Sequence, residues 1–137
     1  MLRPIVLSSV PNYSFTAFAY AIGVILLFLS FIPLSLKTPV QFEIGVDKLA
    51  HSFAYFIFSL ALDHALSFDW GIKKSEKKVV IIVFSFGLVV EIIQGIGLVY
   101  RSFEWYDLLA NSFGIFFFLL VGKTIKKIVV KSGIFIN

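Results

Sequence analysis

The chain alternates between long apolar runs and short polar connections. The apolar runs lie at about residues 13–32, 47–66, 78–98 and 107–122. The first run holds no charged residue, and about 20 helical residues at 1.5 Å each match the roughly 30 Å hydrocarbon core of a bilayer. A segment in lipid must satisfy its backbone polar groups internally, so each run is predicted to be a transmembrane helix. The pattern thus predicts an all-α integral membrane protein with a single domain over residues 1–137.

The connections between these runs differ in charge, and the difference predicts an orientation. Basic residues gather before the first run, between the second and third, and after the fourth. They are Arg3, Lys73, Lys74, Lys77, Lys78, Lys123, Lys126, Lys127 and Lys131, nine of the 12 Lys and Arg. Cytoplasmic connections of membrane proteins carry such an excess. Both termini and the middle connection are therefore expected in the cytoplasm, and the other two connections outside.

Composition supports the membrane assignment and excludes some functions. The chain is 59% hydrophobic and 15% charged, which is seldom seen in a soluble domain of this size. The net charge of +4 does not indicate a nucleic-acid partner, because the Lys groups flank apolar runs, where anionic lipid head groups explain them. The absence of cysteine excludes disulfides and thiolate chemistry. Trp70, Asp63 and His64 are expected at the cytoplasmic interface, outside any functional site.

Polar residues recur on one face of the second run. Asp47 is expected to cap this helix, because a carboxylate accepts hydrogen bonds from free backbone N–H groups. Asp47, His51 and Tyr55 are spaced four residues apart, so they share a helix face. An isolated histidine more often hydrogen-bonds a neighbouring helix than performs chemistry. A carboxylate on the same face makes the functional interpretation about equally favoured.

The third run carries the residue that is most costly to bury. Glu91 lies about 10 Å from the outer end of its helix, where an ionised carboxylate costs a few kcal/mol or more. It must therefore face protein or water. Gln94 is on the same face, and Gly87 and Gly95 flank Glu91 at four-residue spacing, which would let another helix approach closely.

The fourth run repeats this geometry. Asp107, a second expected cap, is followed by Asn111 and Gly114 at helical spacing. Arg101, in the preceding connection, could reach Glu91, Asp107 or an anionic ligand. Three helices that each direct polar groups toward the outer third predict one shared pocket. Its expected members are Asp47, Lys48, His51, Tyr55, Glu91, Gln94, Arg101, Glu104, Asp107 and Asn111.

Taken together, these motifs resemble the VanZ-like family, small bacterial membrane proteins named after a teicoplanin-resistance accessory protein. The resemblance covers about residues 15–122. It rests on Asp47-Lys48-x-x-His51-x-x-x-Tyr55, then Glu91-x-x-Gln94, then Arg101 with Glu104 and Asp107-x-x-x-Asn111-x-x-Gly114. The chain departs from the family pattern at Ser52, where an aromatic is frequent, and at Phe118, where a small residue is usual. The resemblance implies a role in the bacterial cell envelope, linked in one member to glycopeptide resistance, and a location in the cytoplasmic (inner) membrane.

Three functions are compatible with the sequence. The first is binding or handling of an anionic lipid or a lipid-linked envelope component, with Arg101 and Lys48 meeting phosphate or carboxylate. The second is an intramembrane enzyme in which His51, Glu91 and Asp107 act as acid–base groups or ligate a divalent metal. The third is a subunit whose polar residues only join the helices. Membrane lipids are the expected partners, beside a lipid-linked precursor or a glycopeptide; no cofactor and no oligomeric state follow from the sequence.

Overall fold

The computed structural model describes residues 13–31, 44–96 and 103–132. These residues form helices α1 (Ser14–Phe31), α2 (Ile44–His64), η1 (Ala65–Asp69), α3 (Glu76–Gly95) and α4 (Trp105–Ser132). Element η1 is a single π-helical turn that continues α2. Four helices in the described ranges are long and apolar enough to cross a membrane. The predicted all-α class with four candidate membrane spans is thus confirmed.

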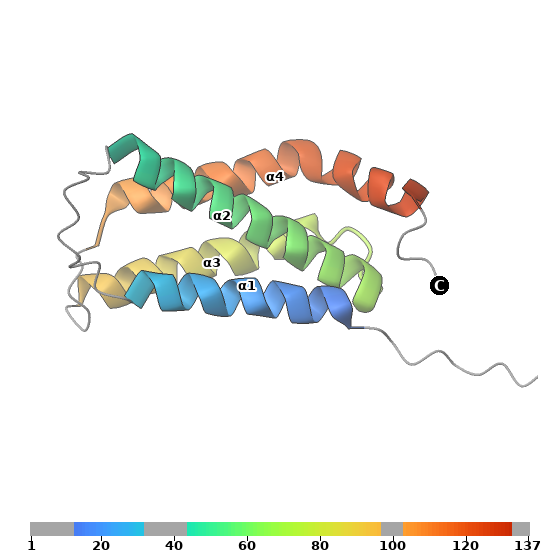
Figure 1. Cartoon of the computed structure of the whole chain (residues 1–137), viewed down its shortest axis with the longest axis horizontal. Helices are drawn as coiled ribbons and strands as arrows, with labels where there is room; N and C mark the ends of the chain where they lie inside the picture. The colour runs from blue at the N-terminus through green and yellow to red at the C-terminus, as the bar shows by residue number, and fades with distance from the viewer. Residues whose placement is uncertain (1–12, 32–43, 97–102, 133–137) are drawn as a thin grey trace, which may run out of the picture.

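Consecutive helices run in opposite directions along one long axis (Figure 1). The start of α1 and the end of α4 therefore lie at one end of the bundle, and the starts of α2 and α4 lie at the other. The most extensive packing is between α2 and α4, whereas α1 contacts mainly α2 and η1. Because α2 and α4 are the helices with the most polar residues, their contact determines the site geometry.

Two expected helix caps are wrong. Helix α2 begins at Ile44 and α4 at Trp105, so Asp47 and Asp107 lie inside the first turns rather than at the cap positions. Their carboxylates form ion pairs with Lys48 instead. A negative charge in the first turn still interacts favourably with the helix dipole. Each aspartate thus stabilises its helix end while its side chain serves a contact between helices.

Helix α4 is much longer than hydropathy predicts. It continues to Ser132, whereas the apolar pattern ends at Gly122. Hydropathy marks the part of a helix that suits lipid, not the helix itself. The segment after Gly122 contains several lysines, which are good helix formers, and no proline or further glycine before Gly133. The backbone therefore continues as a helix beyond the apolar span.

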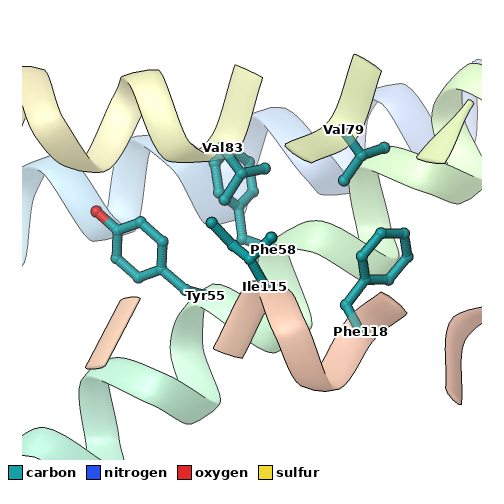
Figure 2. Close-up of a cluster of buried hydrophobic side chains, with 6 residues drawn as sticks. All are labelled: Tyr55, Phe58, Val79, Val83, Ile115 and Phe118. Atoms are coloured by element: carbon teal, nitrogen blue, oxygen red, sulfur yellow. The ribbon is translucent and has the colours of Figure 1, made fainter. Parts of the chain in front are cut away.

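The apolar core joins α2, α3 and α4 (Figure 2). Its buried members are Tyr55, Phe58, Val79, Val83, Ile115 and Phe118. Phe118, at the position where the resemblance leads one to expect a small residue, is 1% exposed and belongs to this core. Gly122 makes room for its ring, because a Cβ added there would lie 2.7 Å from Phe118 Cε2.

Helices α2 and α4 approach each other most closely at Gly114. A Cβ added to Gly114 would lie 2.1 Å from the backbone oxygen of Ser52 and 2.9 Å from the backbone nitrogen of Phe56. Real side chains do not approach a backbone that closely, so only glycine fits here. Ser52 adjoins His51, and Gly114 lies one turn from Asn111. The contact therefore sets the distance between these two polar residues.

A buried polar group lies around Asp63 at the opposite end of the bundle. This residue, which was expected at the interface, is 1% exposed, and its Oδ2 lies 2.8 Å from Lys126 Nζ. Ser75 donates to the other carboxylate oxygen, and Lys126 also donates to Ser67 Oγ at 2.7 Å. We call Asp63, Ser67, Ser75 and Lys126 the Lys126 cluster. It fastens the η1 region to α4. His64 is likewise buried, and its Nδ1 donates to Leu60 O.

The η1 turn also caps α1. Asp69 Oδ2 accepts hydrogen bonds from the backbone N–H of Thr16 at 2.7 Å and from its hydroxyl at 2.8 Å. Trp70, which is largely exposed, donates its indole N–H to Thr16 Oγ1 at 3.0 Å. The first turn of α1 has no acidic residue of its own. A carboxylate from another element therefore satisfies one of its N-terminal N–H groups.

Candidate functional site

A polar cluster surrounds Lys48 where α2 and α4 begin. Lys48 Nζ donates to Asp47 Oδ2 at 3.0 Å, to Glu104 Oε2 at 2.8 Å and to Asp107 Oδ1. Asp107 is buried, whereas Asp47 and Glu104 are partly accessible. We call Asp47, Lys48, His51, Glu104, Asp107 and Asn111 the Lys48 cluster. Within it an ammonium on α2 bridges to two acidic residues at the start of α4.

Two carboxylates are shared between Lys48 and His51. Asp47 uses Oδ2 for Lys48 and turns Oδ1 toward His51 Nε2, at 3.9 Å. Asp107 uses Oδ1 for Lys48 and turns Oδ2 toward the same nitrogen, at 4.0 Å. These separations are too long for direct hydrogen bonds. The imidazole nitrogen and the two oxygens therefore face the same gap but do not hydrogen-bond to one another.

Asn111 determines which nitrogen of His51 faces that gap. His51 Nδ1 lies 3.3 Å from Asn111 Oδ1. An amide oxygen only accepts, so Nδ1 carries the proton in this contact. In the neutral ring, Nε2 then holds a lone pair directed at the two carboxylates. The i+4 position of Asn111 after Asp107 places both residues on the face of α4 that meets α2.

Helix α3 joins the site through Glu91 and Gly87. Glu91 is 1% exposed, and its Oε2 accepts a hydrogen bond from the backbone N–H of Glu104 at 3.2 Å. It thereby ties α3 to the start of α4. One turn earlier, a Cβ on Gly87 would lie 3.2 Å from Tyr55 Oη and 3.3 Å from Asn111 Nδ2. The small residue lets both polar side chains lie against α3.

Gln94, an expected member, contacts a different part of the bundle. Gln94 is buried, but its Nε2 donates to the backbone oxygen of Ser30 at 2.9 Å, so it links α3 to the end of α1. Arg101 lies outside the described residues. Within the described ranges, Lys48 is the cation that pairs with the acidic side chains at this end of the bundle.

A cavity of about 270 Å³ adjoins the Lys48 cluster between α1 and α2. One part of its wall is polar and the other is apolar, and α1 supplies residues to both. The lining residues are Leu26, Leu29, Ser30, Asp47, Ala50, His51, Ala54 and Tyr55. The residues from α1 were missed in the sequence because this helix has no charge to mark it. A second cavity, of about 340 Å³, is almost wholly apolar and lies nearer the start of α1.

The charge of the site limits what it can bind. In the described Lys48 cluster, Asp47, Glu104 and Asp107 contribute three carboxylates against the ammonium of Lys48, a formal charge of −2 with His51 neutral. A cation, or the hydroxyl and amine groups of a polar ligand, would suit such a site. Among the described residues, Asp47, His51 and Asp107 can each offer one ligand atom to a metal, all within 4.8 Å of one another.

The chain matches no protein-family model, no curated protein and no solved structure. The described residues offer an amphipathic cavity, an acidic polar cluster with one bound ammonium, and an imidazole whose free nitrogen faces two carboxylates.

Proposed function

We propose that the protein is a VanZ-like cell-envelope membrane protein that binds the head group of a lipid or lipid-linked envelope component beside the Lys48 cluster. The observation that carries the proposal is the amphipathic cavity. Leu26 and Leu29 suit an acyl or prenyl chain, while His51, Asp47 and Ser30 offer hydrogen-bonding groups to a head group. A link to teicoplanin resistance is what the sequence resemblance adds to this proposal.

The charge balance refines the expected ligand. Lys48 already donates to three carboxylates, so an anionic head group would have to compete with them for the ammonium. A head group with hydroxyl or amine donors can instead meet Asp47 and His51 directly. A phosphate fits if a cation accompanies it or if Arg101 contributes its charge. The proposed ligand is therefore a polar lipid whose head group combines donors with at most a modest negative charge.

The proposed orientation puts the Lys48 cluster at the outer face of the bacterial cytoplasmic membrane. Its support is the distribution of nine of the 12 basic residues. The two tryptophans allow a clean test, because the chain has no cysteine and one tryptophan lies near each end of the bundle, exposed by 59% (Trp70) and 70% (Trp105). In intact cells, an impermeant thiol reagent is expected to label Trp105→Cys and spare Trp70→Cys. The reverse labelling would overturn the orientation, and permeabilised cells serve as the control for accessibility.

Lipid binding can be tested by filling the cavity without changing its polar groups. Ala54→Leu adds a larger side chain to the lining, so binding of phosphatidylglycerol, phosphatidylethanolamine and a polyprenyl phosphate is compared by native mass spectrometry. At least one of these lipids is expected to bind the unmodified chain, and Ala54→Leu is expected to weaken that binding about tenfold or more, equivalent to about 1.4 kcal/mol.

Val24→Phe is the matched control, because Val24 lines the second, apolar cavity instead. It is expected to leave the head-group preference unchanged. Equal binding by Ala54→Leu and the unmodified chain, with both folded, would contradict the proposed site. Failure of all three lipids to bind the unmodified chain would contradict the proposed function for these lipid classes.

One observation favours a second candidate function, an intramembrane enzyme acting on such a lipid. His51 Nε2 faces the two carboxylates across a gap next to the cavity. A general base needs a lone pair directed at the substrate and a partner on the other ring nitrogen, which Asn111 supplies. Accumulation of a modified lipid with the unmodified chain, and its loss in His51→Gln, would favour catalysis over binding.

A further inference from the structure

We infer that Asp47, His51 and Asp107 form a binding site for a divalent transition-metal ion, with Zn²⁺ as the expected occupant. The site lies beside the cavity of the proposed lipid site but does not depend on lipid binding. His51 Nε2, Asp47 Oδ1 and Asp107 Oδ2 face one another across separations of 3.9 and 4.0 Å from the imidazole nitrogen. Ligand atoms about 2.0–2.2 Å from a zinc ion are spaced about 3–4 Å apart. Small side-chain shifts would therefore bring all three atoms to coordination distance from one ion.

The sequence spacing places these three ligands on the facing sides of two helices. Asp47 and His51 are four residues apart in α2, which puts both on one face, and Asp107 projects from the first turn of α4 opposite them. The close contact between Gly114 and Ser52 keeps these two helices near each other. Two helices thus supply a three-ligand site, and the remaining coordination positions are left for water or a ligand from the cavity.

Asn111 supplies the support that a metal-binding histidine needs. Ligating histidines almost always donate their second ring N–H to a nearby acceptor, which fixes the tautomer and orients the ring. His51 Nδ1 meets Asn111 Oδ1 at 3.3 Å, so the proton lies on Nδ1 and Nε2 is available. Asn111 is 2% exposed, and its amide is held between His51 and Gly87. It is a positioning residue rather than a ligand.

Charge balance favours a divalent ion. Within the described Lys48 cluster, three carboxylates against one ammonium leave a formal charge of −2, and one of these carboxylates, that of Asp107, is buried. Lys48 holds the outer oxygens of Asp47 and Asp107, while the oxygens facing His51 are the ones a metal would use. A divalent ion therefore neutralises the site without displacing the ammonium. Because uncompensated charge is costly inside a membrane protein, this gain supports binding.

The donor set predicts which metal binds. One imidazole nitrogen with two carboxylate oxygens suits Zn²⁺ and Mn²⁺ better than Mg²⁺ or Ca²⁺, which prefer oxygen ligands alone. The chain has no cysteine and only two histidines. Metal binding by a protein purified without a polyhistidine tag can therefore be assigned to few positions. His64, the other histidine, lies at the opposite end of α2 and provides a matched control.

The test measures Zn²⁺ bound to the full chain in detergent by equilibrium dialysis and elemental analysis. The unmodified chain is expected to bind about one Zn²⁺. His51→Ala is expected to weaken binding at least tenfold, whereas His64→Gln should match the unmodified chain. Asn111→Leu, which removes the acceptor on Nδ1 but no ligand, is expected to lower affinity by about 10–100-fold. Zn²⁺ should raise the unfolding temperature of the unmodified chain and of His64→Gln but not that of His51→Ala.

The outcomes separate this inference from the proposed function. No stoichiometric Zn²⁺ in the unmodified chain, or undiminished Zn²⁺ in folded His51→Ala, would overturn the metal site. If the metal site is overturned in this way but the chain still binds lipid in the presence of a chelator, the proposed lipid function stands. Zn²⁺ binding that requires His51, in a chain that binds none of the lipid probes, would support the metal site alone.

Discussion

Gly114→Ala is expected to destabilise the bundle by about 3 kcal/mol or more, the upper range for overpacking a close contact. The added Cβ would lie 2.1 Å from the backbone oxygen of Ser52, and backbone cannot rotate away as a side chain can. Helices α2 and α4 would have to separate along their main contact. Thermal unfolding in detergent measures the loss, which is expected to be among the largest for any single methyl group added to this chain.

The same change should also damage the site. Asn111 and Asp107 lie on α4, and His51 and Lys48 on α2, so separating the helices lengthens the contacts between them. We therefore expect Gly114→Ala to weaken Zn²⁺ and lipid binding beyond its effect on stability. Gly45→Ala is the control, because a Cβ there meets nothing within 4 Å. It should leave stability unchanged or slightly raised. Equal stability of the two variants would contradict the described contact.

Lys126→Met is expected to cost about 3–5 kcal/mol, because it leaves a buried carboxylate without its cation. Asp63 is 1% exposed and lies 2.8 Å from Lys126 Nζ, so water cannot readily replace the lost partner. Removing Lys126 also takes a donor from Ser67. Unfolding in detergent is the measurement, and Lys127→Met, which changes an exposed neighbour, is the control.

A double mutant separates the pair energy from the cost of an unpaired charge. Asp63→Leu with Lys126→Met removes both charges, and the combined loss is expected to be well below the sum of the two single losses. Additive losses would mean that the ion pair is not coupled. Neither single change is expected to alter Zn²⁺ affinity strongly in the fraction that folds, because Asp63 lies near the end of α2, whereas Asp47 lies in its first turn.

The membrane helices and most of the Lys48 cluster could be predicted because charge is costly in an apolar run. Asp47, His51, Asp107 and Asn111 lie where helical spacing predicted a shared site, and Glu91 reaches it through Glu104. Which side chain pairs with which across the helices could not be predicted. Spacing places residues on a face, but the partner of Lys48 depends on how two helices are rotated and how closely they approach.

The contacts of the Lys126 cluster could not be predicted from the sequence. An aspartate near the end of an apolar run, such as Asp63, shows no sign of whether its side chain is exposed or paired inside the protein. Its burial depends on Lys126, 63 positions later, and on Ser75 in the turn before α3. The π-helical turn carries no distinctive residue pattern, and it contains Ser67, which accepts a hydrogen bond from the same Lys126. Such a local change of helical geometry is set by tertiary contacts.

The length of α4 has a consequence for how deeply the protein sits. Its 28 residues span about 42 Å, more than a roughly 30 Å hydrocarbon layer holds even at a tilt of about 40°. If α4 crosses the membrane as proposed, part of its length therefore extends beyond the hydrocarbon layer. Lys123, Lys127 and Lys131 follow one another at four-residue spacing along the C-terminal end of α4 and are exposed. In the proposed orientation this ridge rests on the anionic inner leaflet, at about 1 kcal/mol per lysine, and resists outward displacement of the whole bundle. A basic helix end on one side of the membrane would thus fix the depth in the bilayer of the cavity beside the Lys48 cluster.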